Sequence, residues 1–137
     1  MTRHVVAEVS ELPPGSRKLV AIGRRRLGIF NVEGRFYALL HRCPHQGGPL
    51  CEGRVLQWVE SSGPGDLRYG DRHLVQCPWH GWRFDLATGR SWFDPARTRV
   101  RPYPVEVESG ATLVEGPLRA ETYPVTVDRD YVVVELD

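Results

Sequence analysis

Cys43-Pro44-His45-Gln46-Gly47-Gly48-Pro49-Leu50 and Cys77-Pro78-Trp79-His80-Gly81-Trp82 are the two stretches that decide how this chain folds and what it binds. Each stretch offers one thiolate and one imidazole, which are the side chains that bind transition metals. Residues 46–76 separate the two pairs, so one continuous loop cannot supply both. The sequence therefore predicts two loops that the fold brings together at one metal centre.

The spacing within each pair sets the local conformation. Cys43 and His45 are two residues apart, and alternate side chains of an extended segment point the same way. Cys77 and His80 are three residues apart and need a turn, which Gly81 permits. After the first pair, the small residues 47–49 would let backbone N–H groups approach a cluster sulfur without a side chain between them.

Two kinds of metal centre suit two cysteines and two histidines. Zinc accepts this set, but its common fingers pair cysteine with cysteine and histidine with histidine locally. A [2Fe–2S] cluster with two cysteines on one iron and two histidines on the other takes a mixed pair from each of two symmetric loops. Here each loop mixes the two residue types, which favours the cluster and leaves a structural zinc module as a remote alternative.

Length and composition indicate one folded domain. The chain has 137 residues, 41% hydrophobic and 26% charged, which is ordinary for a globular protein. No stretch approaches the 18 apolar residues of a membrane span, and residues 1–8 lack the apolar run of a signal peptide. Three cysteines leave Cys51 unpaired if the other two are ligands, so we expect a buried Cys51 and a reducing, cytoplasmic location.

The net charge of +1 gives no indication of a nucleic-acid partner. Arginine is nevertheless concentrated at residues 24–26 and 97–101. At alternating positions the second group would line one face of a strand. We interpret it as a solvated strand edge or hairpin, with a docking patch for an acidic protein as the alternative.

The pattern of apolar residues predicts an all-β fold. Short runs rich in Val, Ile, Leu, Tyr and Phe recur between turn residues, and Gly or Pro interrupts every longer helical pattern. Glu33-Gly34 is expected to form a tight hairpin turn, and 86–89 another turn. The expected strands are 5–9, 18–23, 27–32, 35–40, 55–60, 73–76, 82–85, 100–108, 122–127 and 131–136.

The two motifs together resemble the Rieske iron–sulfur family, whose pattern is C-x-H followed by C-x-x-H. The hairpin at residues 28–40, the turn at 85–89 and two Tyr-Pro-Val segments extend the resemblance over most of the chain. It implies an antiparallel β-sandwich with a small cluster-binding subdomain made by two loops, near 41–53 and 76–85. Residues 1–137 would then form a single Rieske [2Fe–2S] domain.

The resemblance also implies the ligands and the function. Cys43 and Cys77 would hold one iron, and His45 and His80 the iron that changes valence. Of the other histidines, at 4, 41 and 73, none has a second ligand at useful spacing, so we expect surface or strand-face roles for them. Because no two histidines with a nearby acid remain for a mononuclear iron, we expect an electron carrier rather than an enzyme.

Such a ferredoxin component would take single electrons from a reductase and pass them to an oxygenase or another redox enzyme. A small or accessory subunit of a larger oxidoreductase, similar to the small subunit of nitrite reductases, is the alternative. Two segments depart from small Rieske ferredoxins: residues 60–71, interpreted as a peripheral loop, and 109–121, interpreted as an insertion before the last hairpin.

The residues around the second motif bear on the reduction potential. High-potential Rieske proteins have an additional disulfide, and a Ser and a Tyr donate hydroxyls toward the cluster. Here the corresponding positions hold Trp79, Trp82 and Phe84. Because lost hydroxyl donors destabilise the reduced cluster, we expect the low end of the roughly −150 to +300 mV range. Trp79 and Trp82 would either shield the cluster from water or simply pack.

Overall fold

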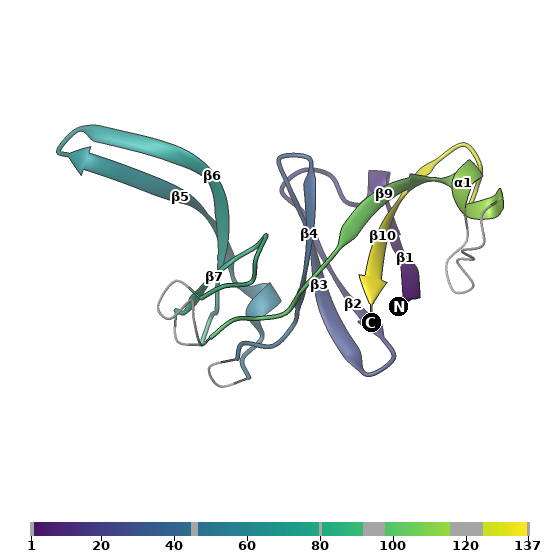
Figure 1. Ribbon diagram of the computed structural model, residues 1–137, viewed down its shortest axis with the longest axis horizontal. Coiled ribbons are helices and arrows are strands. Elements are labelled where there is room, and N and C mark those ends of the chain that lie inside the picture. Colours follow the sequence, from purple (N-terminus) through teal and green to yellow (C-terminus); the bar gives the residue numbers. More distant parts are fainter. Residues whose placement is uncertain (1, 45–46, 80, 92–97, 116–124, 137) are drawn as a thin grey trace.

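The computed structural model describes residues 2–44, 47–79, 81–91, 98–115 and 125–136. Within these residues almost all regular structure is β (Figure 1). The strands are β1 (Thr2–Glu8), β2 (Arg17–Ile22), β3 (Arg25–Val32), β4 (Arg35–Leu40), β5 (Arg54–Gly63), β6 (Asp66–Gln76), β7 (Arg83–Asp85), β8 (Pro102–Tyr103), β9 (Val105–Ser109) and β10 (Asp130–Leu136). Short helices are η1 (Val9–Glu11), η2 (Leu50–Glu52) and α1 (Gly110–Glu115). The predicted all-β class is confirmed.

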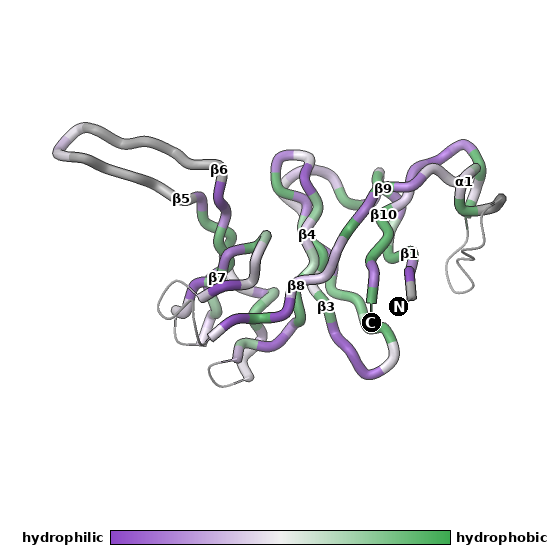
Figure 2. Tube along the Cα trace, viewed as in Figure 1, coloured by the Kyte–Doolittle hydropathy of each residue, from purple (hydrophilic) through white to green (hydrophobic). Residues whose placement is uncertain are grey.

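Two antiparallel sheets form the base of the molecule, in the orders β1-β10-β9 and β2-β3-β4-β8. Apolar side chains of both sheets meet in one buried core, which includes Ala7, Leu27, Ile29 and Val132. Figure 2 shows apolar residues along β10 and polar residues at the β2–β3 turn. Within the described residues, no helix has the length and apolar character that a membrane crossing requires.

The third sheet, β5-β6-β7, belongs to a smaller subdomain at the other side of the molecule (Figure 1). Its core is separate from that of the base and includes Leu50, Val75 and Phe84 together with all three cysteines. Phe30 and Leu39 of the base sheet also belong to this core, so β3 and β4 contribute to both cores. The subdomain is thus packed directly on the β3–β4 hairpin.

The β3–β4 hairpin forms as predicted. Val32 pairs with Arg35 across a two-residue turn, in which Glu33 has φ 53° and Gly34 has φ 90°. Two consecutive positive φ values are typical of the turn whose twist matches that of antiparallel strands, and glycine adopts the second without strain. The turn at 86–88 is also confirmed.

Residues 60–71 do not form a peripheral loop, so that interpretation was wrong. β5 and β6 continue as paired strands to Gly63 and Asp66, with a turn between them. The resulting ribbon extends away from the rest of the molecule (Figure 1). Residues added relative to small Rieske ferredoxins therefore lengthen two paired strands, because strand pairing depends on the neighbouring strand.

The C-terminal expectations need four corrections. Residues 125–127 are not in a strand, and the rest of the predicted strand 122–127 lies outside the described residues. β10 instead pairs with β1 on one side and β9 on the other, so it is the central strand of its sheet and not half of a final hairpin. The arginine-rich segment is also not a strand over 98–101, where Arg99 makes one isolated bridge to Arg90. The predicted strand 100–108 is divided into β8 and β9.

Candidate metal centre

The first motif folds into a loop closed on its cysteine. The N–H of Cys43 donates to the carbonyl of Gly48 (2.9 Å), and the N–H of Gly47 donates to the carbonyl of Cys43 (2.7 Å). Gly47 has φ 76°, a conformation that glycine adopts at no steric cost. Pro44 is exposed and Cys43 is buried, as expected from their alternation. His45 and Gln46 lie outside the described residues.

The second motif has the same hydrogen-bond pattern. The N–H of Cys77 donates to the carbonyl of Trp82 (2.7 Å), and the N–H of Gly81 donates to the carbonyl of Cys77 (3.0 Å). Gly81 has φ 74°, close to the value at Gly47 in the first loop. The two loops therefore present their cysteines in matching conformations, as a symmetric metal site requires. His80 lies outside the described residues.

The fold brings the two predicted cysteine ligands together. Cys43 and Cys77 are each 1% exposed, are not in a disulfide and belong to the same buried cluster. Gly48 of the first loop lies against the second cysteine, since a Cβ atom there would be 3.0 Å from Cys77 Sγ. That contact needs a residue without a side chain, as the small residues 47–49 had suggested.

A [2Fe–2S] cluster suits these two thiols. Thiolates are its ordinary ligands, and burial limits solvent access to the metal. The glycine beside Cys77 leaves space at the sulfur that any other residue would fill. Within the described residues no group of three or more metal-binding side chains occurs. His45 and His80 lie outside those residues and stay predicted ligands.

The third cysteine has a structural role, as predicted. Cys51 is fully buried, and burial raises the pKa of its thiol to about 12. Its Sγ atom lies 3.7 Å from the carbonyl oxygen of Leu39 and 3.8 Å from that of Leu40. The thiol therefore stays protonated at neutral pH and packs as a small apolar side chain.

His41 is more than a surface or strand-face residue. Its Nδ1 atom accepts a hydrogen bond from the N–H of Cys51 (3.1 Å), which fixes the neutral tautomer. Burial lowers the pKa of His41, and the nearby Glu52 opposes that shift. The side chain thus ties the segment before the first loop to η2. Its position next to the first motif was the only sequence signal for this role.

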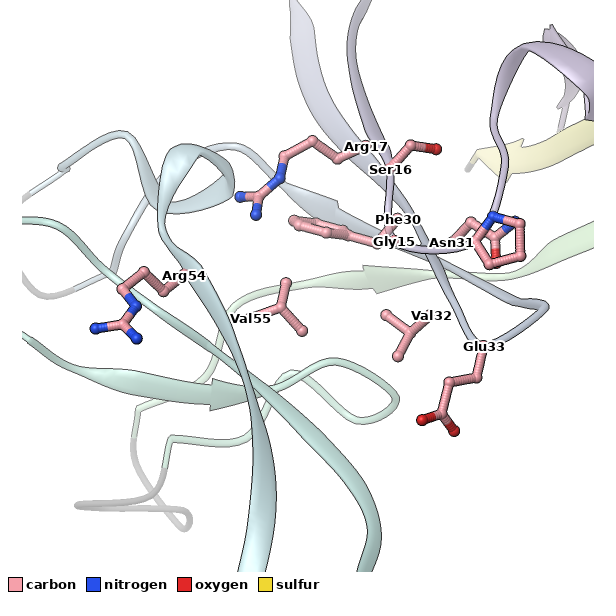
Figure 3. Close-up of a pocket in the computed structure, with 10 residues that line it drawn as sticks. Gly15, Ser16, Arg17, Phe30, Asn31, Val32, Glu33, Arg54 and Val55 are labelled. Carbon is pink, nitrogen blue, oxygen red and sulfur yellow. The ribbon is translucent and has the colours of Figure 1, made fainter.

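Sequence reasoning also missed Arg17, which joins the subdomain to the base. Its Nη1 atom donates to the carbonyl of Cys51 (3.0 Å) and to that of Gly53, while its guanidinium lies 5.3 Å from the centre of the Phe30 ring. A pocket of about 620 Å³ opens beside this contact, between β3 and β5 (Figure 3). Phe30, Val32 and Val55 point into it, and neither Cys43 nor Cys77 lines it.

The two tryptophans of the second motif differ. Trp79 is 58% exposed, and its ring lies against Gly48. Trp82 is half-buried and stacks on the buried ring of Phe84, with 6.5 Å between centroids. Packing therefore accounts for Trp82, whereas it leaves most of Trp79 in contact with solvent.

Comparison with known proteins identifies the family. The sequence profile of the Rieske [2Fe-2S] domain matches residues 2–104. The ferredoxin subunit of biphenyl dioxygenase from Pseudomonas sp. (strain KKS102) is 30% identical over 115 residues, which cover 84% of this chain and 93% of that protein.

Two further proteins are similar to the chain. Apoptosis-inducing factor 3 from Homo sapiens is 29% identical over 115 residues, but the chain spans only 16% of its length. A crystal structure assigned as the small subunit of an NADH-dependent nitrite reductase from Mycobacterium tuberculosis has a TM-score of 0.67 at 20% identity. That alignment covers 99% of this chain and 96% of the other, and it supports the fold alone. The matched loops, the paired buried thiols and the family profile agree: this chain belongs to the Rieske [2Fe-2S] domain family and binds one [2Fe–2S] cluster.

Proposed function

We propose that this protein is an electron carrier of the Rieske ferredoxin type. The observation that carries the proposal is the pair of buried thiols, Cys43 and Cys77, on two loops with the same backbone pattern. The cluster, when bound, supplies reversible one-electron chemistry. Similarity to a dioxygenase ferredoxin subunit over most of both chains supports the same role.

The protein's own residues have three tasks in this function. Cys43, His45, Cys77 and His80 would hold the cluster, the two cysteines on its buried side. The hydrogen bonds that close each loop keep the donor atoms in place, because ligand position depends on the surrounding backbone. His41 and Arg17 hold η2 and the loops against the base.

The partners we propose are a reductase as donor and an oxygenase or another oxidoreductase as acceptor.

The residues after 104, where the family match ends, belong to the same domain in this proposal, because β10 is paired with β1. We propose no catalytic centre in this chain. A small or accessory subunit of a larger oxidoreductase is the second candidate, and a protein of the same fold is assigned as such a subunit. Co-purification with a large subunit would favour that candidate.

The proposal is tested by anaerobic purification followed by iron, sulfide and zinc analysis and by EPR of the reduced protein. We expect two irons and two sulfides per chain. Cys43→Ser and His80→Ala should each abolish the EPR signal, whereas Cys51→Ala and His4→Ala should retain it. Zinc without acid-labile sulfide would establish the structural zinc module instead. A normal signal in Cys43→Ser or His80→Ala would remove that residue from the ligands.

A reduction potential below 0 mV is part of the proposal, because Trp82 and Phe84 offer no hydroxyl to the cluster. Phe84 is fully buried in the core that contains both cysteines. Phe84→Tyr would introduce a hydroxyl donor there and should raise the potential. Protein-film voltammetry of the two proteins measures the shift, and a wild-type potential well above 0 mV would contradict the proposal.

A further inference from the structure

The pocket of about 620 Å³ between β3 and β5 lies where the subdomain meets the base (Figure 3). Its lining comes from both parts of the molecule. Residues 14–17 and 30–33 belong to the base, and Arg54 and Val55 belong to β5 of the subdomain. Pockets that hold small organic ligands measure roughly 300–1,000 Å³. The pocket therefore has the size of a small-molecule site.

Apolar side chains form the inner surface of this pocket. Phe30 is fully buried, whereas Val32 and Val55 are half-buried. Figure 3 shows both valines directed into the space between β3 and β5. Apolar surface that stays in contact with water inside a concave site is covered favourably by an apolar ligand.

Charged side chains stand at two opposite sides of the pocket. Figure 3 shows the guanidinium groups of Arg17 and Arg54 on one side and the carboxylate of Glu33 on the other. The Arg17 guanidinium is next to the start of β5, since Nη1 donates to the carbonyl of Gly53. Two cations and one anion give the lining a net charge of +1. A ligand with a single negative charge balances it.

Both guanidiniums have N–H groups left for a ligand. Among the hydrogen bonds of the described residues, Arg17 uses only Nη1, which donates to two backbone carbonyls. Arg54 is exposed, and none of the ion pairs between described side chains includes it. The hydroxyl of Ser16, in contrast, already donates to the carbonyl of Pro13. Because the planar guanidinium matches the geometry of a carboxylate, the two arginines favour that kind of anion.

We propose that this pocket binds an apolar monocarboxylate, a small organic acid with a hydrophobic body. The carboxylate would pair with Arg17 and Arg54, and the body would cover Val32 and Val55. Glu33 at the far side disfavours a second negative charge on the ligand. The site is separate from the cysteine loops and does not depend on the electron-carrier function.

The test compares ligands of matched shape and different charge by calorimetric titration of the cluster-loaded protein. 4-Phenylbutyrate and octanoate should each bind at one site, with a dissociation constant of about 1 mM or lower. 4-Phenylbutan-1-ol and 4-phenylbutylamine lack the carboxylate and should bind at least about tenfold more weakly. Suberate, which is octanoate with a second carboxylate, should also bind at least about tenfold more weakly than octanoate. Acetate has almost no apolar body and should not bind.

Three variants locate the binding site. Arg54→Gln should weaken binding of 4-phenylbutyrate by about tenfold or more, because a charged hydrogen-bond donor is lost. Arg90→Gln is the matched control, since it removes an exposed arginine of the subdomain outside the pocket lining, and it should change the dissociation constant by less than about twofold. Val55→Phe should fill the pocket and abolish binding. The EPR signal and the thermal midpoint show whether each variant is folded and loaded.

Several results would overturn the carboxylate site. They are equal affinity for the acid and the alcohol, equal affinity for octanoate and suberate, equal affinity of wild type and Arg54→Gln, and no saturable binding of either acid. The electron-carrier function fails separately: a protein that binds 4-phenylbutyrate but has no [2Fe–2S] EPR signal would overturn that function and not this site.

Discussion

Gly48 of the first loop lies directly against Cys77 of the second, where a Cβ atom on the glycine would come within 3.0 Å of the Cys77 sulfur and 2.9 Å of the Trp79 ring. The residues belong to different motifs, yet the position of one cysteine depends on the absence of a side chain in the other motif. This contact couples the position of the second cysteine to the backbone of the first loop. It also makes the assembly of the site sensitive to a single methyl group.

Gly48→Ala should therefore impair cluster binding. The added methyl group has to displace either the sulfur or the indole, and overpacking of this kind costs about 1–3 kcal/mol. We expect less iron and acid-labile sulfide per chain than in the wild type. Gly63→Ala is the matched control, because nothing lies within 4 Å of a Cβ atom there. Full cluster content in Gly48→Ala would show that the loops can separate without loss of the site.

Arg17→Ala should loosen the subdomain from the base. The substitution removes hydrogen bonds to the carbonyls of Cys51 and Gly53, and hydrogen bonds from a charged donor contribute about 1.5–3 kcal/mol. Cluster loss at elevated temperature, followed by visible absorbance, should become faster. Arg35→Ala removes an exposed arginine at the β3–β4 turn and should leave the rate unchanged. Equal rates in the two variants would contradict the role of Arg17.

Gly28→Ala should destabilise the protein by about 1–3 kcal/mol, because a Cβ atom on this strand residue would lie 2.5 Å from the sulfur of Cys51. The midpoint of anaerobic thermal unfolding measures the loss. Cys51→Gly removes the obstructing side chain, so the double variant Gly28→Ala/Cys51→Gly should recover part of the stability lost by Gly28→Ala. Simple additivity of the two single changes would rule out a direct clash.

The buried thiol of Cys51 predicts how stability depends on pH. Its pKa is raised from 9.0 to about 12 in the folded protein, so the unfolded chain releases its proton first as pH rises. The contribution of the Cys51 thiol to the free energy of unfolding is complete below pH 9 and is lost between pH 9 and about 12. Over that range the free energy of unfolding falls by at most about 1.4 kcal/mol per pH unit. Cys51→Ala lacks this ionisation.

The corresponding measurement is the thermal midpoint of wild type and Cys51→Ala from pH 8 to 10.5. The difference between the two proteins should be constant below about pH 9 and should then change in favour of Cys51→Ala. Parallel curves over the whole range would mean that the thiol ionises equally in the folded and unfolded states.

Local patterns in the sequence identified several features correctly because neighbouring residues alone determine them. The turn at Glu33-Gly34 needs two residues that tolerate positive φ, and the strands on either side show the expected apolar runs. The same holds for Cys51, whose burial follows from the apolar character of an unpaired thiol. The family was also recognisable, since the spacing of the two motifs is specific.

Contacts between distant segments were not recognisable in this way. The departure from small Rieske ferredoxins at residues 60–71 was interpreted as a peripheral loop, but pairing between β5 and β6 makes it a ribbon. A strand was expected at 122–127 as the partner of β10, whereas β10 pairs with β1 and β9. Strand pairing depends on which backbone edges meet in space, and a single strand carries little information about its partner.

The sequence by itself determined the chemistry of this protein: two mixed pairs of cysteine and histidine, an all-β chain and a free buried thiol. Only the tertiary structure decided that the two loops close in the same way, that Gly48 touches Cys77, and that Arg17 and His41 hold η2 in place. The reason is physical. Ligand type and turn preference are properties of single residues and their neighbours, whereas these contacts exist only after segments far apart in the chain have packed together.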